Sequence, residues 1–399
     1  MFEAIHLRRR KISSAYNPDN KVKLVRGGKD YFDLLEQLIN LAEKTIHFQT
    51  YIFETDKTGK IIFDALFKAA KRNVKIFLLL DGYASNSLPD DFIKQLTESG
   101  IEFRWFDPLF SGTKFYFGRR LHHKVVVADE KFGLVAGLNI ADRYNDMERI
   151  PAWLDFAIFV EGQACITLNE ICVKLWGKKS RGRKLIHSEN TTIFKNSNIN
   201  EHALVRVRRN DWVRGKYDIS KSYIEMFNKA INNITIMSSY FLPGSVFRIR
   251  IKAALKRGVK IRVVLAGISD IKLSKYAERY WYAWMLRNNI EIYEYQKTVL
   301  HAKVAVCDNE WATIGSYNVN NLSAYASIEL NLDIQSVPFI KTLTDEIDAI
   351  IKNDCEQITE ENYQKRKNIF WRLAAWGSYS ITRILLFFFT YSTDKKRKK

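Results

Sequence analysis

The sequence is poor in cysteine and proline, with 4 cysteines and 6 prolines in 399 residues. The cysteines are scattered and include no C-x-x-C pair, and they lie at Cys165, Cys172, Cys307 and Cys355. This pattern argues against a disulfide framework and against a zinc site, and it favours reduced thiols. The first residues, MFEAIHLRRRKISS, lack the apolar stretch of a secretory signal. We therefore expect a cytoplasmic protein.

Acidic residues are also scarce relative to basic ones. The chain has 63 Lys and Arg against 44 Asp and Glu, a formal net charge of +19. This excess suits a polyanionic partner, which is nucleic acid or an anionic membrane surface, and charge alone does not choose between them. A hydrophobic content of 47% and a charged content of 27% are typical of folded globular proteins. The length suggests two or three domains.

The chain contains an internal repeat. ALFKAAKRNVKIFLLLDG in the first half corresponds to RIKAALKRGVKIRVVLAG in the second half. Each copy predicts a helix, then a left-handed residue at Asn73 or Gly258, then a strand over Val74–Leu80 or Val259–Leu265. Because these strands are apolar on both faces, we expect a sheet covered by helices on both sides. The fold class is therefore α/β, with two related domains.

The domain boundaries follow from the composition. We predict a basic N-terminal segment at 1–20, a first domain at 21–177, a basic inter-domain connection at 178–217, a second domain at 218–350 and C-terminal helices with an aromatic and basic tail at 351–399. The connection contains the basic run GKKSRGRK and a candidate strand, ALVRVRR. The basic run is either a solvated loop or a contact for lipid headgroups or phosphate.

Each half carries the motif H-x-K-x4-D, as LHHKVVVAD in the first and LHAKVAVCD in the second. On a strand, positions i and i+2 share a face, so His122 and Lys124 project together, as do His301 and Lys303. His123 faces the other way, and we assign it a packing or surface role. One copy of this motif is a weak signal, whereas two copies at the same place in a repeat point to function.

Further polar residues follow each motif. Asp129 and Asp308 come at the ends of the motif strands, and Asn139 and Asn318 follow small residues after the next strand. Two His, two Lys and two Asn facing each other would suit phosphoryl transfer without a metal. Lys and Asn stabilise the non-bridging oxygens, one His attacks phosphorus, and the other transfers protons.

A carboxylate on the far ring nitrogen would orient each imidazole. The candidates are Asp155 in AWLDFAIFVEG and Glu329 in ASIELNLDI, each on a predicted strand downstream of its motif.

From Val22 to Leu332 the sequence resembles the phospholipase D superfamily, whose signature is this doubled motif. GRRLHHKVVVADEKFGLVAGLNIADRY, WLDFAIFVEG and SSYFLPG are similar to the bacterial cardiolipin synthase branch that lacks an N-terminal transmembrane pair, although Ser239 replaces a proline of that branch. The resemblance implies two phospholipase D-like domains in tandem. Each would be a mixed β-sheet flanked by helices, related by a pseudo-twofold axis, with the active site between them.

The resemblance also implies roles. His122 would be the nucleophile and His301 the general acid and base, with the reverse assignment left open. Lys124, Lys303, Asn139 and Asn318 would hold the phosphate, and Asp129 and Asp308 would complete the catalytic set and shape its hydrogen bonds. No metal or organic cofactor is expected.

The implied reaction is phosphatidyl transfer through a phosphohistidine. Two phosphatidylglycerols would give cardiolipin and glycerol, and phosphatidylethanolamine is an alternative lipid. A phosphodiesterase or nuclease of the same superfamily is the runner-up, in which the charge of +19 would follow a nucleic-acid backbone. A lipid-binding scaffold without activity is a third reading. The cardiolipin-branch segments disfavour nucleic acid as the partner and favour anionic phospholipids, with phosphatidylglycerol as the substrate.

The tail NIFWRLAAWGSYSITRILLFFFTYSTDKKRKK has no uninterrupted apolar run of spanning length, because Arg372 and Arg383 divide it. We expect it to lie in the membrane interface, on the cytoplasmic side of a bacterial inner membrane. A buried helix and a short insertion are the alternatives. The expected membrane-contact residues are Trp371, Arg372, Trp376, Arg383, Lys395, Lys396 and Arg397.

Overall fold

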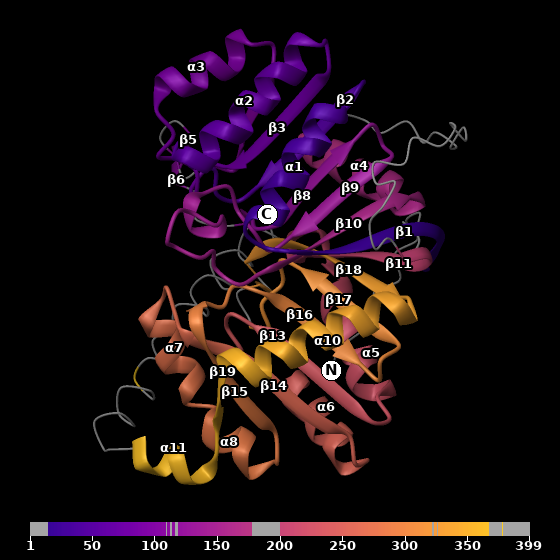
Figure 1. Cartoon of the computed structure of the whole chain (residues 1–399), viewed down its shortest axis with the longest axis vertical. Coiled ribbons are helices and arrows are strands. Elements are labelled where there is room, and N and C mark those ends of the chain that lie inside the picture. Colours follow the sequence, from indigo (N-terminus) through magenta and orange to yellow (C-terminus); the bar gives the residue numbers. More distant parts are fainter. Residues whose placement is uncertain are drawn as a thin grey trace.

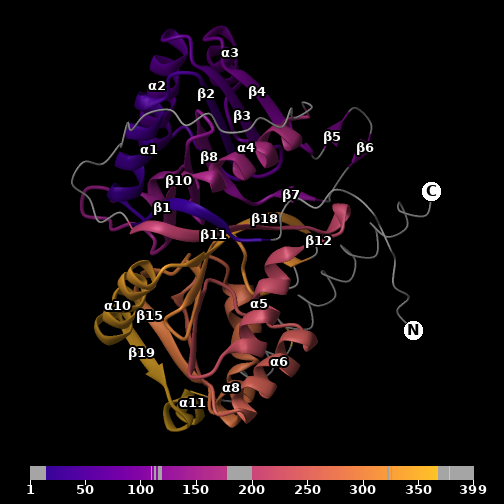
Figure 2. The same cartoon turned by 90° about the vertical axis from the view of Figure 1, so that its right-hand side faces the viewer.

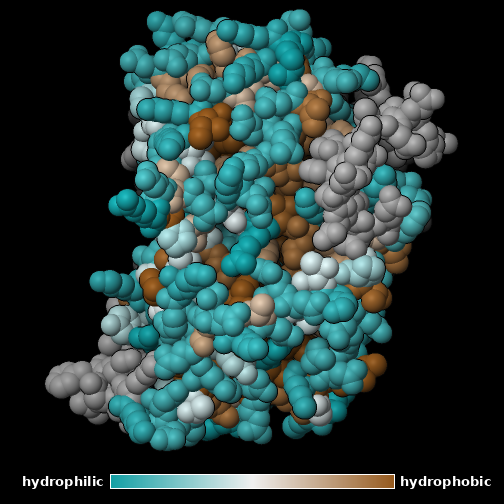
Figure 3. All heavy atoms as spheres, viewed as in Figure 1, coloured by the Kyte–Doolittle hydropathy of each residue, from teal (hydrophilic) through white to brown (hydrophobic). Residues whose placement is uncertain are grey.

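The computed structural model describes residues 15–108, 110–111, 114–115, 119–177, 200–320, 323–324, 326–366 and 377. Two α/β halves lie one above the other in Figure 1, each with its own helices. Most of the surface in the same view is hydrophilic, and hydrophobic residues are scattered among the hydrophilic ones (Figure 3).

The first half contains the strands β1 (Asn17–Arg26), β2 (Thr45–Thr50), β3 (Lys75–Asp81), β4 (Glu102–Phe106), β5 (Phe110–Ser111), β6 (Lys114–Phe115), β7 (Arg120–Leu121), β8 (Lys124–Ala128), β9 (Phe132–Ala136) and β10 (Phe156–Gly162). Its helices are α1 (Lys29–Leu41), α2 (Lys57–Lys71), α3 (Asp90–Glu98) and α4 (Gln163–Trp176).

The second half contains the strands β11 (Asn200–Asp211), β12 (Lys216–Tyr217), β13 (Asn233–Ser238), β14 (Lys260–Ile268), β15 (Glu291–Val299), β16 (Lys303–Cys307), β17 (Trp311–Gly315), β18 (Ser327–Gln335) and β19 (Cys355–Ile358). Its helices are α5 (Asp218–Lys229), α6 (Ser245–Lys256), α7 (Lys272–Arg279), α8 (Tyr282–Arg287), α10 (Val337–Asp354) and α11 (Glu360–Arg366).

The two halves share one strand arrangement. In the first, β2 pairs parallel with β3 and antiparallel with β8, and β9 and β10 continue antiparallel. In the second, β13 pairs parallel with β14 and antiparallel with β16, and β17 and β18 follow. The predicted α/β class and tandem repeat are therefore confirmed. The helices preceding β3 and β14 end at left-handed residues as predicted, Asn73 with φ 64° and Gly258 with φ 91°.

Strands β1 and β11 join the halves into one sheet. β1 pairs antiparallel with β10 and with β11, and β11 pairs antiparallel with β18. Figure 2 shows β1, β11 and β18 crossing the middle of the molecule. The strand anticipated at Ala203–Arg209, in the segment expected to be the inter-domain connection, is the greater part of β11.

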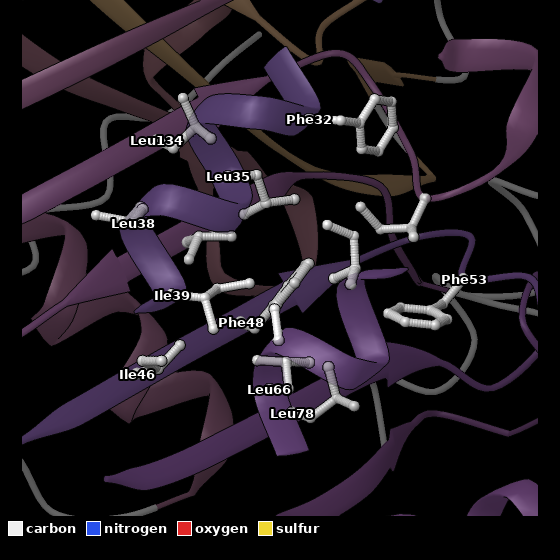
Figure 4. Packing of buried hydrophobic residues seen from close by; sticks show 14 of the residues in the cluster. Phe32, Leu35, Leu38, Ile39, Ile46, Phe48, Phe53, Leu66, Leu78 and Leu134 are labelled. Carbon is white, nitrogen blue, oxygen red and sulfur yellow. The ribbon is translucent and has the colours of Figure 1, made fainter. Parts of the chain in front are cut away.

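Hydrophobic packing forms layers on both sides of the sheet. Helices α1 and α2 cover one face of the first half, where Leu35 and Leu66 pack in one cluster with Phe48 and Leu78 (Figure 4). The helical spacing of the apolar residues in α1 and α2 explains why each helix buries one face. Removing one such Leu side chain costs about 2–5 kcal/mol.

A central cluster lies between the halves. It contains Phe156 and Leu168 from the first half together with Leu330 and Phe339 from the second, all at or near zero exposure. Helices α5, α6 and α8 cover the other face of the second half through a third cluster. Because both halves contribute to one close-packed core, their relative position is set by packing. Any site built from both halves is positioned by the same packing.

Candidate active site

The doubled motif lies at equivalent positions in the two halves. Lys124 and Lys303 are the first residues of β8 and β16, and His122 and His301 stand two residues before them. Both lysines are buried, at 2% and 1% exposure. His123 points into the core of the first half, and its Nε2 lies 2.9 Å from Gln49 Oε1, so its predicted packing role is confirmed.

Each imidazole is held by a carboxylate from the other half. His122 Nδ1 lies 3.0 Å from Glu329 Oε2, and His301 Nδ1 lies 2.7 Å from Asp155 Oδ2. Both carboxylates are fully buried. The sequence identifies these two carboxylates but not their partners. Lys303 Nζ also lies 2.9 Å from His301 Nδ1. In the tautomer whose Nδ1–H donates to the carboxylate, the Nε2 lone pair of each ring is left for chemistry.

Backbone pairing between the halves brings these groups together. β7, directly before His122, pairs parallel with the start of β18, and His122 N donates to Ile328 O at 3.1 Å, next to Glu329. Symmetrically, Leu154 bridges to Leu300, and His301 N donates to Leu154 O at 2.8 Å, next to Asp155. The crossed contacts therefore follow from two matching backbone junctions.

Small residues beside the carboxylates are a steric requirement in one half. A Cβ on Gly137 would lie 2.4 Å from Asp155 Oδ2 and 2.7 Å from Oδ1, closer than real contacts allow. At the equivalent place in the second half, Ser316 Oγ donates to Glu329 Oε2 at 2.5 Å. The small residues at these two positions therefore accommodate the carboxylates.

Burial sets the protonation of the basic groups. It lowers the pKa of Lys124 to about 7 and that of Lys303 to about 8. Burial also lowers the pKa of His122, and it lowers that of His301 well below the usual range. At neutral pH both imidazoles are therefore uncharged, and the positive charge that an anion would meet comes from Lys303 and from the protonated fraction of Lys124. An arriving phosphate would raise the pKa values of both lysines.

The two carboxylates differ. Burial raises the pKa of Asp155 to about 7. Burial also acts to raise the pKa of Glu329, but His122 and Lys124 outweigh it and hold that pKa below its ordinary value. Glu329 is therefore an anion at neutral pH, whereas Asp155 is near its titration midpoint. At neutral pH the two imidazoles therefore contact carboxyl groups of different charge.

The lysines and asparagines do not form a symmetric set. Lys124 Nζ donates to His122 O at 2.6 Å, and Lys303 Nζ donates to His301 O and, at 3.2 Å, to Ser239 Oγ. Asn139 is engaged at both ends, accepting from Ile52 N at 3.1 Å and donating to the Tyr144 hydroxyl at 2.9 Å.

The equivalent asparagine of the second half is different. Asn318 is 5% exposed, and its Oδ1 has no hydrogen-bond partner among the residues that the structure describes.

The catalytic role that the sequence assigned to Asp129 and Asp308 needs correction. Asp129 accepts hydrogen bonds of 2.8–2.9 Å from the backbone N–H groups of residues 43–45, where the chain enters β2. Asp308 accepts from residues 231–233, where it enters β13, at 2.7–2.8 Å. Each stands five residues beyond its motif lysine on an extended strand, about 16 Å away. They hold the loops that start the repeated strands and do not contact the imidazoles.

Aromatic rings beside the imidazoles were not identified from the sequence. Tyr51 lies 4.9 Å from His122 between ring centroids, and Tyr144 and Trp153 lie 5.1 Å and 6.0 Å from His301. Arg143 stacks over Tyr144 and pairs with Glu54 at 2.8 Å. Single aromatic residues in loops carry no periodic signal, and their proximity arises only from folding.

Two arginines before the first motif were also not assigned roles. Arg119 forms a bidentate, buried pair with Asp211 at 2.6–2.9 Å. Arg120 pairs with Asp81 at 3.4 Å, and Asp81 also accepts from Leu121 N at 2.7 Å. These pairs tie the strand before His122 to β3 and β11, and they help to set the position of the imidazole.

Several sequence predictions fall on other parts of the chain. The expected membrane-contact residues, Trp371, Arg372, Trp376, Arg383, Lys395, Lys396 and Arg397, lie outside the described residues. Within the described ranges, no helix combines the length and apolarity that a membrane crossing requires. The same ranges contain no group of three or more His, Cys, Asp or Glu side chains arranged to hold a metal ion. All four cysteines are free thiols, as predicted.

The two α/β units bring both copies of the H-x-K motif together at their junction, and each imidazole contacts a buried carboxylate. This combination defines a protein of the phospholipase D superfamily. The chain belongs to the family described as "Cardiolipin synthase, PLD-like domain", whose model matches residues 35–149 and 223–351.

Named relatives agree with this family. The chain is 32% identical to cardiolipin synthase B of Salmonella typhimurium over 356 residues, 89% of this chain and 85% of that protein. It is 31% identical to cardiolipin synthase B of Escherichia coli over 362 residues, 90% and 86% of the two chains.

The fold is similar to that of phosphatidylserine synthase from Haemophilus influenzae, with a TM-score of 0.70 at 12% identity over 92% of this chain and 95% of that chain. At this identity the likeness concerns the fold alone.

Proposed function

We propose that this protein is a phosphatidyltransferase that makes cardiolipin from phosphatidylglycerol through a phosphohistidine intermediate. The second lipid is phosphatidylglycerol or phosphatidylethanolamine. The observation that carries the proposal is the pair of crossed imidazole–carboxylate contacts beside two buried lysines. Membership of the cardiolipin synthase family supports the substrate class.

The unequal carboxylates support His122 as the nucleophile. Glu329 stays ionised, so it offsets the positive charge that develops on His122 when Nε2 bonds to phosphorus. Asp155 titrates near neutral pH, which suits a pair that must take up and release a proton, so His301 is assigned as the acid and base.

The first half-reaction transfers phosphatidyl to the enzyme. The bound phosphodiester anion raises the pKa of His301, which enters the reaction protonated on Nε2. His122 Nε2 forms a bond to phosphorus as the bond from phosphorus to the glycerol oxygen breaks, and His301 gives its proton to that oxygen. Lys124 and Lys303 stabilise the non-bridging oxygens. The products are free glycerol and phosphatidyl-His122.

The second half-reaction transfers phosphatidyl to the acceptor. A hydroxyl of a second phosphatidylglycerol gives its proton to His301 Nε2 while its oxygen bonds to phosphorus. The bond between His122 and phosphorus breaks, which frees the imidazole and releases cardiolipin. Water in place of the lipid hydroxyl would give phosphatidic acid, so exclusion of water decides between transfer and hydrolysis.

We place this reaction on the cytoplasmic side of a bacterial inner membrane. The protein would associate peripherally with anionic phospholipids, with the aromatic and basic C-terminal tail as one contact.

The test is a lipid assay with purified full-length protein. Phosphatidylglycerol in detergent micelles, with and without phosphatidylethanolamine, is incubated with wild type, His122→Ala or His301→Ala. Cardiolipin and glycerol from wild type alone support the proposal, and release of ethanolamine would identify phosphatidylethanolamine as the donor. Phosphatidic acid without cardiolipin would make the enzyme a hydrolase. Cleavage of nucleic acid with no lipid turnover would establish the nuclease instead.

A further inference from the structure

Helix α7 and the residue that follows it, Tyr280, expose aliphatic and aromatic side chains together with Lys272, and they bury Lys275 and Glu278 together with Ala277. Leu273, Tyr276 and Tyr280 follow an i, i+3, i+7 spacing that places them on one face. Their exposed fractions are 38%, 37% and 38%, whereas Lys275 and Glu278 on the opposite face are only 7% and 1% exposed. A surface helix of a water-soluble protein normally shows the reverse distribution.

The exposed apolar face continues before the helix. Ile268, the last residue of β14, is 47% exposed, and Ile271 is 48% exposed. We call Ile268, Ile271, Leu273, Tyr276 and Tyr280 the α7 surface. The exposed Lys272 lies within this segment. Apolar atoms are visible at the left edge of the second half in Figure 3, where Figure 1 places α7.

Buried ionic contacts hold the helix in this orientation. Lys275 Nζ lies 2.9 Å from Glu278 Oε1, 2.8 Å from Glu294 Oε1 and 2.7 Å from the Tyr282 hydroxyl. Such buried clusters are seldom more stabilising than apolar packing of the same volume. Fold stability alone therefore does not account for the burial of Lys275 and Glu278 while Leu273 and Tyr276 stay exposed. A partner surface that covers Leu273 and Tyr276 accounts for this arrangement.

We propose that the α7 surface docks onto an anionic phospholipid bilayer. Isoleucine and leucine side chains enter the boundary of the acyl region, and tyrosines lie at the headgroup level. Lys272 is exposed beside Leu273 and meets anionic headgroups, whereas Arg279 pairs with the buried Glu294 at 3.6 Å. The inference rests on the proposed function, because a phosphatidyltransferase finds its substrate in such a bilayer.

The α7 surface is connected to the phosphate-binding groups. Glu278 Oε2 accepts a 2.9 Å hydrogen bond from Phe241 N, two residues after Ser239, the hydroxyl partner of Lys303. Tyr240 between them donates its hydroxyl to Asp270, which lies within the docking segment. A bilayer on the α7 surface would thus be held close to Lys303, where a lipid phosphate is to bind.

The test measures vesicle binding by the full chain. Wild type, Ile271→Glu/Leu273→Glu and the control Ile231→Glu are floated with vesicles of phosphatidylglycerol or of phosphatidylcholine. Ile231 is 75% exposed and precedes the amino end of β13, whereas α7 follows the carboxyl end of the parallel neighbour β14. We expect the double variant to lose at least about tenfold in partition onto phosphatidylglycerol vesicles, and the control to match wild type.

Two further measurements test whether the double variant is folded and whether position 273 enters the bilayer. Turnover of a short-chain phosphatidylglycerol, dispersed below its micelle concentration, should be equal for wild type and the double variant. A polarity-sensitive dye on Leu273→Cys should shift to the blue with phosphatidylglycerol vesicles, and the same dye on Ile231→Cys should not.

Equal vesicle binding by wild type and the double variant, or no dye shift at Leu273→Cys, would overturn the docking surface. A wild-type dimer that the double variant dissociates, with vesicle binding unchanged, would assign the surface to a second copy instead. Cardiolipin formation by wild type separates the two proposals. If the protein docks on vesicles but turns over no lipid, the proposed function is wrong and the docking surface stands. If it turns over lipid but its vesicle binding does not depend on the α7 surface, the docking surface is wrong and the proposed function stands.

Discussion

His301 of the second half and Asp155 of the first half are joined by a 2.7 Å contact, although 146 residues separate them in the chain. The matching contact, between His122 and Glu329, crosses in the other direction over 207 residues. Neither half therefore contains a complete imidazole–carboxylate pair. Each half therefore depends on the other for the orientation of its histidine.

The crossed pairs predict matching effects of carboxylate removal. Asp155→Asn should lower the rate of phosphatidyl transfer by about 10²–10⁴-fold, because the amide cannot hold the imidazole in the required tautomer or support its proton transfer. Glu329→Gln should act similarly through His122. The measurement is kcat for cardiolipin formation, with circular dichroism to establish folding. Activity within threefold of wild type in either variant would contradict the crossed-pair assignment.

Gly137 predicts a steric effect on the same site. The methyl group of Gly137→Ala would stand 2.4 Å from Asp155 Oδ2, so the carboxylate must move away from His301. We expect at least about tenfold lower kcat. Gly215→Ala is the control, since a Cβ there meets no atom within 4 Å although φ is 65°. That variant should cost about 1 kcal/mol of stability and leave activity intact. Equal kinetics for the two variants would be evidence against the steric account.

The buried lysines predict a pH dependence of substrate capture. The free enzyme holds the positive charges of Lys124 and Lys303 only below their pKa values of about 7 and about 8. As pH rises through this range, the charge that binds phosphate is lost. We therefore expect kcat/KM for phosphatidylglycerol to fall on the alkaline side, from pH 7 to 9. A profile that is flat to pH 9.5 would exclude this titration.

The same lysines predict the opposite trend for stability. Their pKa is about 10.5 in the unfolded chain and lower in the folded protein, so between pH 7 and 10 the unfolded state binds more protons. Their contribution to the free energy of unfolding therefore increases with pH in this window. Denaturant titrations of wild type and Lys124→Met isolate it, and the difference in unfolding free energy between the two proteins should change with pH. A constant difference would contradict the depressed pKa.

Asp129 predicts a separation of folding from catalysis. Asp129→Ala removes the acceptor for backbone N–H groups of residues 43–45 and should cost about 1–3 kcal/mol of unfolding free energy. Asp308→Ala should behave alike. Activity per folded molecule should stay within about tenfold of wild type. Denaturant unfolding and kcat measured below the melting transition provide the comparison, and a thousandfold loss of kcat without loss of stability would restore the catalytic role.

Local patterns in the sequence determined much of this structure. The repeated helix–strand segments predicted β3 and β14, and the i, i+2 spacing predicted that each motif histidine and lysine lie together. Asp155 and Glu329 were identified as carboxylates on strands. These features depend on periodicity and short-range chemistry, which a sequence displays directly.

Only the tertiary structure decided which carboxylate meets which histidine. That choice comes from the pairing of β7 with β18 and of Leu154 with Leu300, contacts between segments far apart in the chain. The tertiary structure also decided the roles of Asp129 and Asp308. Their motif suggested a catalytic role, whereas their hydrogen bonds hold the loops before β2 and β13. The tertiary structure likewise decided the α7 surface, since exposure of Leu273 and burial of Lys275 depend on the groups packed around the helix. Long-range packing sets these contacts, and residue spacing carries no record of it.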